Sequence, residues 1–115
     1  MSRGSASGVA AKRRSPAPVF AALGDATRLD LVSKLSSGRR YSISGLASRS
    51  RLTRQAIAKH LRVLESVGIV HGVRAGRENL FAFDPEPMDE IRGYLDRVAE
   101  EWDQALARLK SFVED

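Results

Sequence analysis

Residues 49–62 read RSRLTRQAIAKHLR, a stretch with five basic residues, no acidic residue and apolar residues at helical spacing. A helix that begins at Thr53 places three apolar residues on the face that packs against a core: Ile57, Leu61 and Leu64. Because successive residues turn by about 100°, the opposite face carries hydrogen-bonding and cationic side chains: Gln55, Lys59, Arg62 and Ser66. This separation of a dry face from a cationic face is typical of a helix that reads DNA.

Length and composition limit the classes of protein to consider. A chain of 115 residues is long enough for one compact domain with flexible ends and too short for two substantial cores. It has no cysteine, which excludes disulfides, thiolate metal sites and cysteine nucleophiles. No apolar run approaches the roughly 20 residues of a membrane helix, and the first residues lack the apolar segment of a secretory signal. We therefore expect a soluble, cytoplasmic protein.

The net charge of +5 is unevenly distributed. Residues 18–83 hold eleven basic and four acidic side chains, whereas residues 84–115 hold four basic and ten acidic ones. A basic middle and an acidic end indicate one surface that meets a polyanion and another that stays away from it. Solvated faces that merely differ in sign are the alternative.

The first 17 residues hold four basic side chains, no acid and almost nothing to bury. We expect a disordered basic arm over residues 1–17, with the fold beginning near Pro18. Such an arm can add phosphate contacts or enter a minor groove, and it can equally have no role. Its composition also permits a transit peptide.

Two helices are expected between this arm and Ser36. The first is short and covers residues 18–23. The second follows Gly24, with Asp25 as its N-cap, and runs to about Ser36. Its predicted buried stripe consists of Leu29, Val32 and Leu35.

A short helix is predicted next, capped by Ser42 or Ser44 and running through Ser50. It buries Leu46 and Ala47.

The cationic helix then extends over residues 53–67, with Thr53 as its N-cap and Gly68 as its end. The few residues Arg51-Leu52 join the short helix to this one, and Leu52 fills the corner between them. Two helices joined in this way form a helix-turn-helix.

Two β-type runs, residues 69–73 and 80–83, come directly after this pair of helices. They predict a hairpin over residues 69–83, with Arg74 and Arg77 at its tip around a glycine that permits a tight bend. A hairpin in this position is a wing, and the order of elements favours that interpretation over an ordinary surface turn.

A final long helix is predicted within residues 84–115, because Pro87 and the acids around it suit a first helical turn. Its apolar residues alternate steps of three and four, the repeat of a coiled coil: Met88, Ile91, Leu95, Val98, Trp102, Ala105, Leu109 and Phe112. A stripe of about 25 residues exceeds what a small domain can cover. We therefore expect a homodimer through this helix, joined by residues of the first helix: Val19, Phe20 and Leu23. A helix packed only on its own domain is the alternative.

Together these elements predict a mainly α fold with a small β-hairpin, a winged helix-turn-helix in the order α-α-α-α-β-β-α. The expected divisions are a basic arm (1–17), a DNA-binding domain (18–83) and a dimerisation helix (84–115).

Three segments, VFAALGDATRLDLVSKL, SISGLASRSRLTRQAIAKHLRVLESVGIV and RAGRENLFAF, resemble the arsenic-repressor (ArsR/SmtB) family of bacterial winged-helix transcription regulators. The resemblance covers about residues 18–83. Its most specific parts are ALGDATRLDLV, similar to the family's opening helices, and QAIAKHLRVLESVGIV, similar to its recognition helix and the step into the wing.

This resemblance implies a homodimeric repressor that binds a palindromic operator, often upstream of its own operon. Metal-sensing members place cysteines near the helix that here reads SISGLASRS, or paired histidines and carboxylates in the last helix, and neither set exists here. The histidines are His60 and His71, and for His60 a phosphate contact or a packing role is favoured over metal ligation. We expect no metal and no cofactor, and the sequence identifies no effector.

The recognition helix predicts specific DNA contacts. Gln55 matches the edge of adenine, and Lys59 or Arg62 that of guanine, while Arg54 at the helix start suits either bases or phosphates. Four residues near the helix N-terminus suit phosphates: Arg49, Ser50, Arg51 and Thr53. Arg74 and Arg77 of the wing suit the minor groove or the flanking backbone. The full candidate set also includes His60.

Two other functions fit the same fold. A winged-helix module can bind protein, with an incidental basic face, and an architectural protein can bind any duplex about equally. We find no paired carboxylates with a pocket, no nucleophile with a nearby base and no phosphate-cradling glycine loop, so we expect no catalytic residue and no enzyme.

Overall fold

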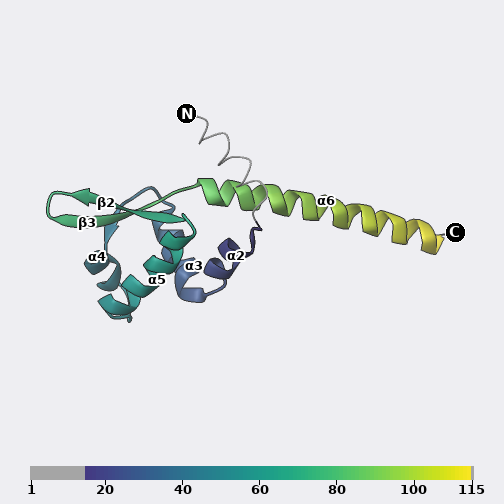
Figure 1. Ribbon diagram of the computed structural model, residues 1–115. Coiled ribbons are helices and arrows are strands. Elements are labelled where there is room, and N and C mark those ends of the chain that lie inside the picture. Colours follow the sequence, from purple (N-terminus) through teal and green to yellow (C-terminus); the bar gives the residue numbers. More distant parts are fainter. Residues whose placement is uncertain (1–14, 115) are drawn as a thin grey trace, which may run out of the picture.

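The computed structural model describes residues 15–114, a helical domain with a small sheet and one long helix that extends away from it (Figure 1). The elements are α2 (Ala17–Leu23), α3 (Ala26–Leu35), β1 (Tyr41–Ser42), α4 (Ile43–Ala47), α5 (Arg54–Ser66), β2 (Val70–Ala75), β3 (Glu78–Phe83) and α6 (Glu86–Glu114). This confirms the predicted winged helix-turn-helix, with one added strand, β1. Most of the predicted basic arm, residues 1–14, lies outside the described residues.

Helices α3, α4 and α5 each begin at a side chain that accepts a backbone hydrogen bond. Asp25 Oδ2 accepts from the Arg28 N–H of α3 at 3.0 Å. Ser42 Oγ and Thr53 Oγ1 accept in the same way at the starts of α4 and α5, at 3.0 and 3.1 Å. The caps predicted at Asp25 and Thr53 are confirmed, and Ser42 rather than Ser44 caps α4. These oxygens satisfy donors that a helix start leaves without a partner.

The core lies where α5 crosses α3, α4 and the sheet. The predicted apolar face of α5 is confirmed, because Ile57, Leu61 and Leu64 are at most 1% exposed. Leu52, in the link before α5, packs against the same core as expected. Five further apolar side chains complete its centre: Leu31, Leu35, Leu46, Ile69 and Val70.

The predicted stripe of α3 was wrong at one position. Leu29 is 53% exposed, whereas Leu31 is 2% exposed. Because two residues differ by about 200° around a helix, burying Leu31 and Leu35 turns Leu29 toward solvent. The spacing of Leu29, Val32 and Leu35 alone did not show which of two overlapping stripes the core would take.

The hairpin has the extent that the sequence predicted, but its strands are longer and its turn is shorter. Strands β2 and β3 pair antiparallel from Val70 opposite Phe83 to Ala75 opposite Glu78, so only two residues form the turn. Gly76 occupies the first of them with φ +62°, the left-handed backbone that two-residue hairpin turns require. Arg74, expected in the connection, lies in β2 instead.

Strand β1 was missed because two residues carry no periodicity. Tyr41 pairs with Phe81 and Ser42 with Leu80, which gives a three-stranded sheet in the order β1-β3-β2. This pairing joins the start of α4 to the wing, so it fixes the position of the helix-turn-helix relative to the hairpin.

Helix α6 lies on the domain only through its first turns. Pro87 and Ile91 are buried and Met88 packs against the core, but Trp102, Leu109 and Phe112 are 64, 57 and 80% exposed. The helix is about 44 Å long at 1.5 Å per residue, and Figure 1 shows that its C-terminal part runs clear of the domain. Among residues 15–114, no helix combines the length and apolar character needed to cross a membrane.

Candidate nucleic-acid interface

The outward face of α5 presents the polar side chains that the sequence placed there. Gln55, Lys59, Arg62 and Arg54 are all exposed. Their backbone is fixed by the apolar face of the same helix, which is almost completely excluded from solvent. A rigid helix with a hydrogen-bonding, cationic outer surface has the form needed to enter a major groove.

The segment before α5 adds further candidate phosphate ligands. Arg49 and Arg51 are exposed, while Ser50 and Thr53 use their hydroxyl oxygens within the turn. Ser50 Oγ accepts the Leu52 N–H at 3.0 Å, and Thr53 Oγ1 caps the helix. A hydroxyl that accepts one hydrogen bond still has a proton to donate, so both remain able to contact a phosphate oxygen.

The tip of the wing carries the two arginines singled out in the sequence. Arg74 and Arg77 are exposed, and Arg74 Nε donates to the Gly76 carbonyl at 3.2 Å. This hydrogen bond folds the Arg74 side chain back over the turn. The wing therefore holds positive charge at the end of the hairpin, away from the core.

The basic side chains of this surface keep their charge available. Within residues 15–114 the described contacts between acidic and basic side chains are Lys34 with Asp30 and His60 with Asp25, and neither uses an arginine or lysine of α5, its preceding segment or the wing. A cationic surface without acidic partners attracts a polyanion and contributes to affinity by displacing its counterions.

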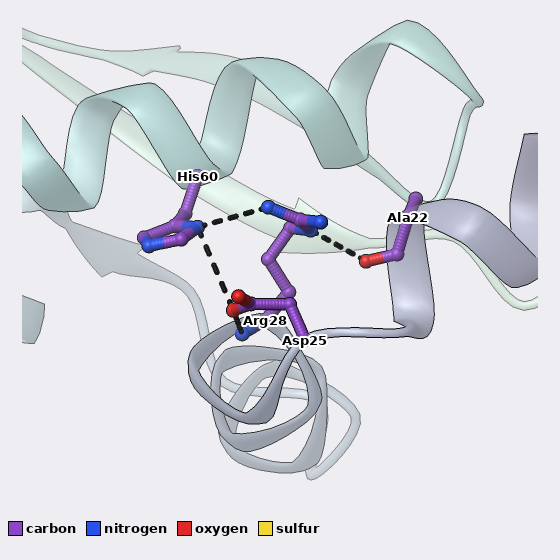
Figure 2. Close-up of polar contacts among 4 residues, drawn as sticks. All are labelled: Ala22, Asp25, Arg28 and His60. Carbon is purple, nitrogen blue, oxygen red and sulfur yellow. Dashed lines mark hydrogen bonds and ion pairs between the residues drawn. The ribbon is translucent and has the colours of Figure 1, made fainter.

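His60 differs from the other candidates on α5. Its side chain is 23% exposed and faces α2 and α3, where it meets Arg28 (Figure 2). Arg28 Nη1 lies 3.2 Å from His60 Nδ1, and Arg28 Nε donates to the Ala22 carbonyl at 2.6 Å. Because a guanidinium can only donate, Nδ1 accepts in this contact. The structure thus places His60 in the packing role rather than beside Gln55, Lys59 and Arg62.

Asp25 also takes part in the polar contact between α3 and α5, since its Oδ2 lies 3.8 Å from His60 Nδ1. We call this cluster of Asp25, Arg28 and His60 the joint between the two helices. The hydrogen bond from the Arg28 N–H, helped by the charge of Arg28, lowers the pKa of Asp25 below its usual value. Arg28 was missed as a positioning residue. Its three-residue spacing from Asp25 was visible, but its contact with His60 joins residues far apart in the sequence.

The residues predicted at a dimer interface fall into two groups. Val19, Leu23, Met88 and Ile91 pack at least partly on their own domain. Phe20 lies against Tyr94, with ring centroids 5.8 Å apart in an edge-to-face arrangement, which places α2 beside the third turn of α6. The others lie further along α6, where most are exposed: Leu95, Val98, Trp102, Ala105, Leu109 and Phe112.

No group of three or more His, Asp or Glu side chains that could hold a metal lies together within the described part of the chain. The charged groups near α5 instead hold helices against one another or face solvent.

Similar proteins identify the family of this chain. A family described as "Bacterial regulatory protein, arsR family" matches residues 25–71. An uncharacterized HTH-type transcriptional regulator of Bacillus subtilis, YuzN, is 36% identical over 85 residues, which are 68% of this chain and 92% of that protein. The HTH-type transcriptional regulator Rv2034 of Mycobacterium tuberculosis is 31% identical over 101 residues, or 88% of this chain and 91% of that protein.

Solved structures have the same architecture. An ArsR-like transcriptional regulator from Rhodococcus sp. RHA1 superposes with a TM-score of 0.78 at 39% identity, covering 93% of this chain and 94% of that one. A homodimeric winged helix-turn-helix DNA-binding domain from Mycobacterium bovis shares the fold with a TM-score of 0.59 at 24% identity, over 74% of this chain and 78% of that one. The relatives are transcriptional regulators and not enzymes. The chain therefore belongs to the ArsR family of winged helix-turn-helix, DNA-binding transcriptional regulators.

Proposed function

We propose that the protein is a homodimeric repressor that binds an inverted-repeat operator in the cytoplasm, with α5 in the major groove. The outward face of α5 carries this proposal, because it combines base-reading side chains with positive charge on a rigid helix. A two-fold axis would set two such helices in successive major grooves about 34 Å apart, and an inverted repeat matches that symmetry.

Each side chain has a role suited to its chemistry. Gln55 reads adenine, and Lys59 or Arg62 reads guanine, because their donors and acceptors match those base edges. Arg54 lies at the helix start and reaches either bases or phosphates. Phosphates are bound by Arg49, Ser50, Arg51 and Thr53. Arg74 and Arg77 of the wing contact the minor groove or the flanking backbone.

Dimerisation through α6 explains its exposed apolar face. Trp102, Leu109 and Phe112 are more than half exposed, although each belongs to a regular seam. Packing against a second copy, with Val19, Phe20 and Leu23 of α2 at its edge, would remove this surface from water. The chain then divides into a DNA-binding domain (18–83) and a dimerisation helix (84–115), preceded by a basic arm (1–17).

The homodimer noted for the M. bovis relative is consistent with this assembly. No cofactor is part of the proposal, and the effector that would release DNA has no assigned site.

The test is a titration of the full chain against the DNA upstream of its own coding region and against a scrambled duplex, at two salt concentrations, with a footprint. Tight binding to one inverted repeat is expected, and Lys59→Ala with Arg62→Ala should weaken it and flatten its salt dependence. Lys34→Ala, on α3 and paired with Asp30, is the control and should leave binding unchanged.

Other outcomes favour the alternatives. Equal, salt-sensitive binding to both duplexes would favour an architectural DNA binder, and absence of binding to either would favour a protein-interaction module. An unchanged affinity in the Lys59/Arg62 double variant would refute the assignment of α5 as the reading helix.

A further inference from the structure

Beside the polar face of α5 lies an open, largely apolar hollow between α5 and the start of α4. It is lined by Ile43, Thr53, Arg54, Gln55 and Ala58. Ile43 and Ala58 are half-buried, while Arg54 and Gln55 at its edge are exposed. An apolar recess is thus built next to hydrogen-bonding side chains on the surface that the proposed function turns toward DNA.

The position of the hollow follows from the helix geometry. Ala58 lies about 60° around α5 from Gln55 and about 40° from Arg62. The buried Leu61 is about 60° away on its other side, so Ala58 lies at the border between the outward and the buried face. Its small side chain leaves room that a larger residue would fill. Thr53 Oγ1, also at this side of the recess, accepts a backbone N–H as the cap of α5.

In the major groove, base edges present donors, acceptors and one apolar group, the C5-methyl of thymine. We propose that this hollow receives that methyl group, so that each operator half-site contains a thymine read by Ile43 and Ala58 beside the base read by Gln55. The inference rests on the proposed function and adds to it a base identity and two residues that determine it.

A DNA-side substitution tests this directly, because it leaves the protein unchanged. The full chain selects its preferred duplex from a random-sequence library, and each thymine of the selected site is replaced in turn by deoxyuridine, which lacks only the methyl group. One thymine per half-site should matter, with affinity falling about fourfold for one half-site and about fifteenfold for both, as expected for one buried methyl group each.

Protein variants connect that thymine to the hollow. Ala58→Leu fills the recess, so thymine and deoxyuridine duplexes should then bind equally well. Ala56→Leu makes the same change about 160° away on α5, outside the hollow, and should keep the fourfold preference. A thermal melt of each variant confirms that it is folded.

The outcomes separate the two proposals. If no sequence is enriched from the library, the proposed sequence-specific function fails. If a site is enriched but no deoxyuridine weakens binding, or if Ala58→Leu retains the thymine preference, the hollow does not read a methyl group and this inference is overturned.

Discussion

Helices α5 and α6 are both amphipathic, yet the domain buries the apolar face of α5 and leaves most of the apolar face of α6 exposed. On α5, Ile57, Leu61 and Leu64 are at most 1% exposed within their own domain. On α6, Trp102 and Phe112 are 64 and 80% exposed. The same kind of pattern therefore stabilises the fold in one helix and leaves an exposed apolar surface in the other, which we propose as the dimer interface. Which role applies depends on whether neighbouring elements reach the stripe.

The largest expected effect is the loss of stability when a residue on the buried face of α5 is truncated. Leu64→Ala should lower the free energy of unfolding by about 2–5 kcal/mol, because it leaves a cavity in a fully buried site. Chemical denaturation of the full chain measures the loss. Leu29→Ala, at 53% exposure on α3, should change stability by less than about 1 kcal/mol, and a similar loss in both variants would contradict the described core.

A substitution on the exposed apolar face of α6 should weaken dimerisation without unfolding the domain. Trp102→Glu should weaken dimerisation by at least about 2 kcal/mol, since a charge replaces an aromatic anchor in the proposed seam. Sedimentation would then detect monomers whose circular dichroism remains helical. Ser111→Glu adds the same charge outside the seam and should leave the dimer intact. Dimers of unchanged affinity in Trp102→Glu would argue that α6 is not the interface.

The proposed DNA surface of α5 and the segment before it divides into residues that specify a base and residues that position the protein on phosphates. Gln55→Ala should remove about 1–3 kcal/mol of discrimination at one base pair while leaving nonspecific affinity nearly unchanged. Arg51→Ala should instead weaken binding to all duplexes alike and reduce the salt slope by about one unit. Competition binding with single-base variants of the operator distinguishes the two. The same loss pattern in both variants would contradict this division of roles.

The side-chain caps at the helix starts should contribute less to the free energy of unfolding than the buried core residues do. Thr53→Ala removes the acceptor of the Ala56 N–H and should cost about 1 kcal/mol of stability, whereas Thr53→Ser should retain most of it. Urea unfolding compares the two variants. A loss of equal size in both would show that the capping hydrogen bond is not responsible.

The smallest expected effect concerns the joint that holds α5 against α3. Because the pKa of Asp25 is lowered in the fold, its charge stabilises the protein above its usual pKa, and this contribution is lost as the pH falls through the folded pKa. Asp25→Asn keeps a capping oxygen without the charge, so it should melt slightly earlier at neutral pH. That difference should disappear in acid, and a constant difference at all pH values would exclude a charge effect.

Much of the recognition surface could be predicted because local spacing determines it. Gln55, Lys59 and Arg62 share a face by helix geometry alone, and their exposure followed once Ile57, Leu61 and Leu64 were buried. His60 could not be assigned in this way. It lies at the edge of the apolar face, and its partner Arg28 is 32 residues away in the sequence.

The sequence by itself determined the caps of α3 and α5, the apolar and cationic faces of α5, the hairpin after Gly68 and the apolar stripe of α6, because capping and periodicity act within a few residues. Only the tertiary structure decided that Leu31 rather than Leu29 is buried, that Tyr41 and Ser42 form a strand, and that Ile43 and Ala58 line one hollow beside Gln55. Each of these depends on contacts between segments distant in the chain, and such contacts arise only when the whole domain packs.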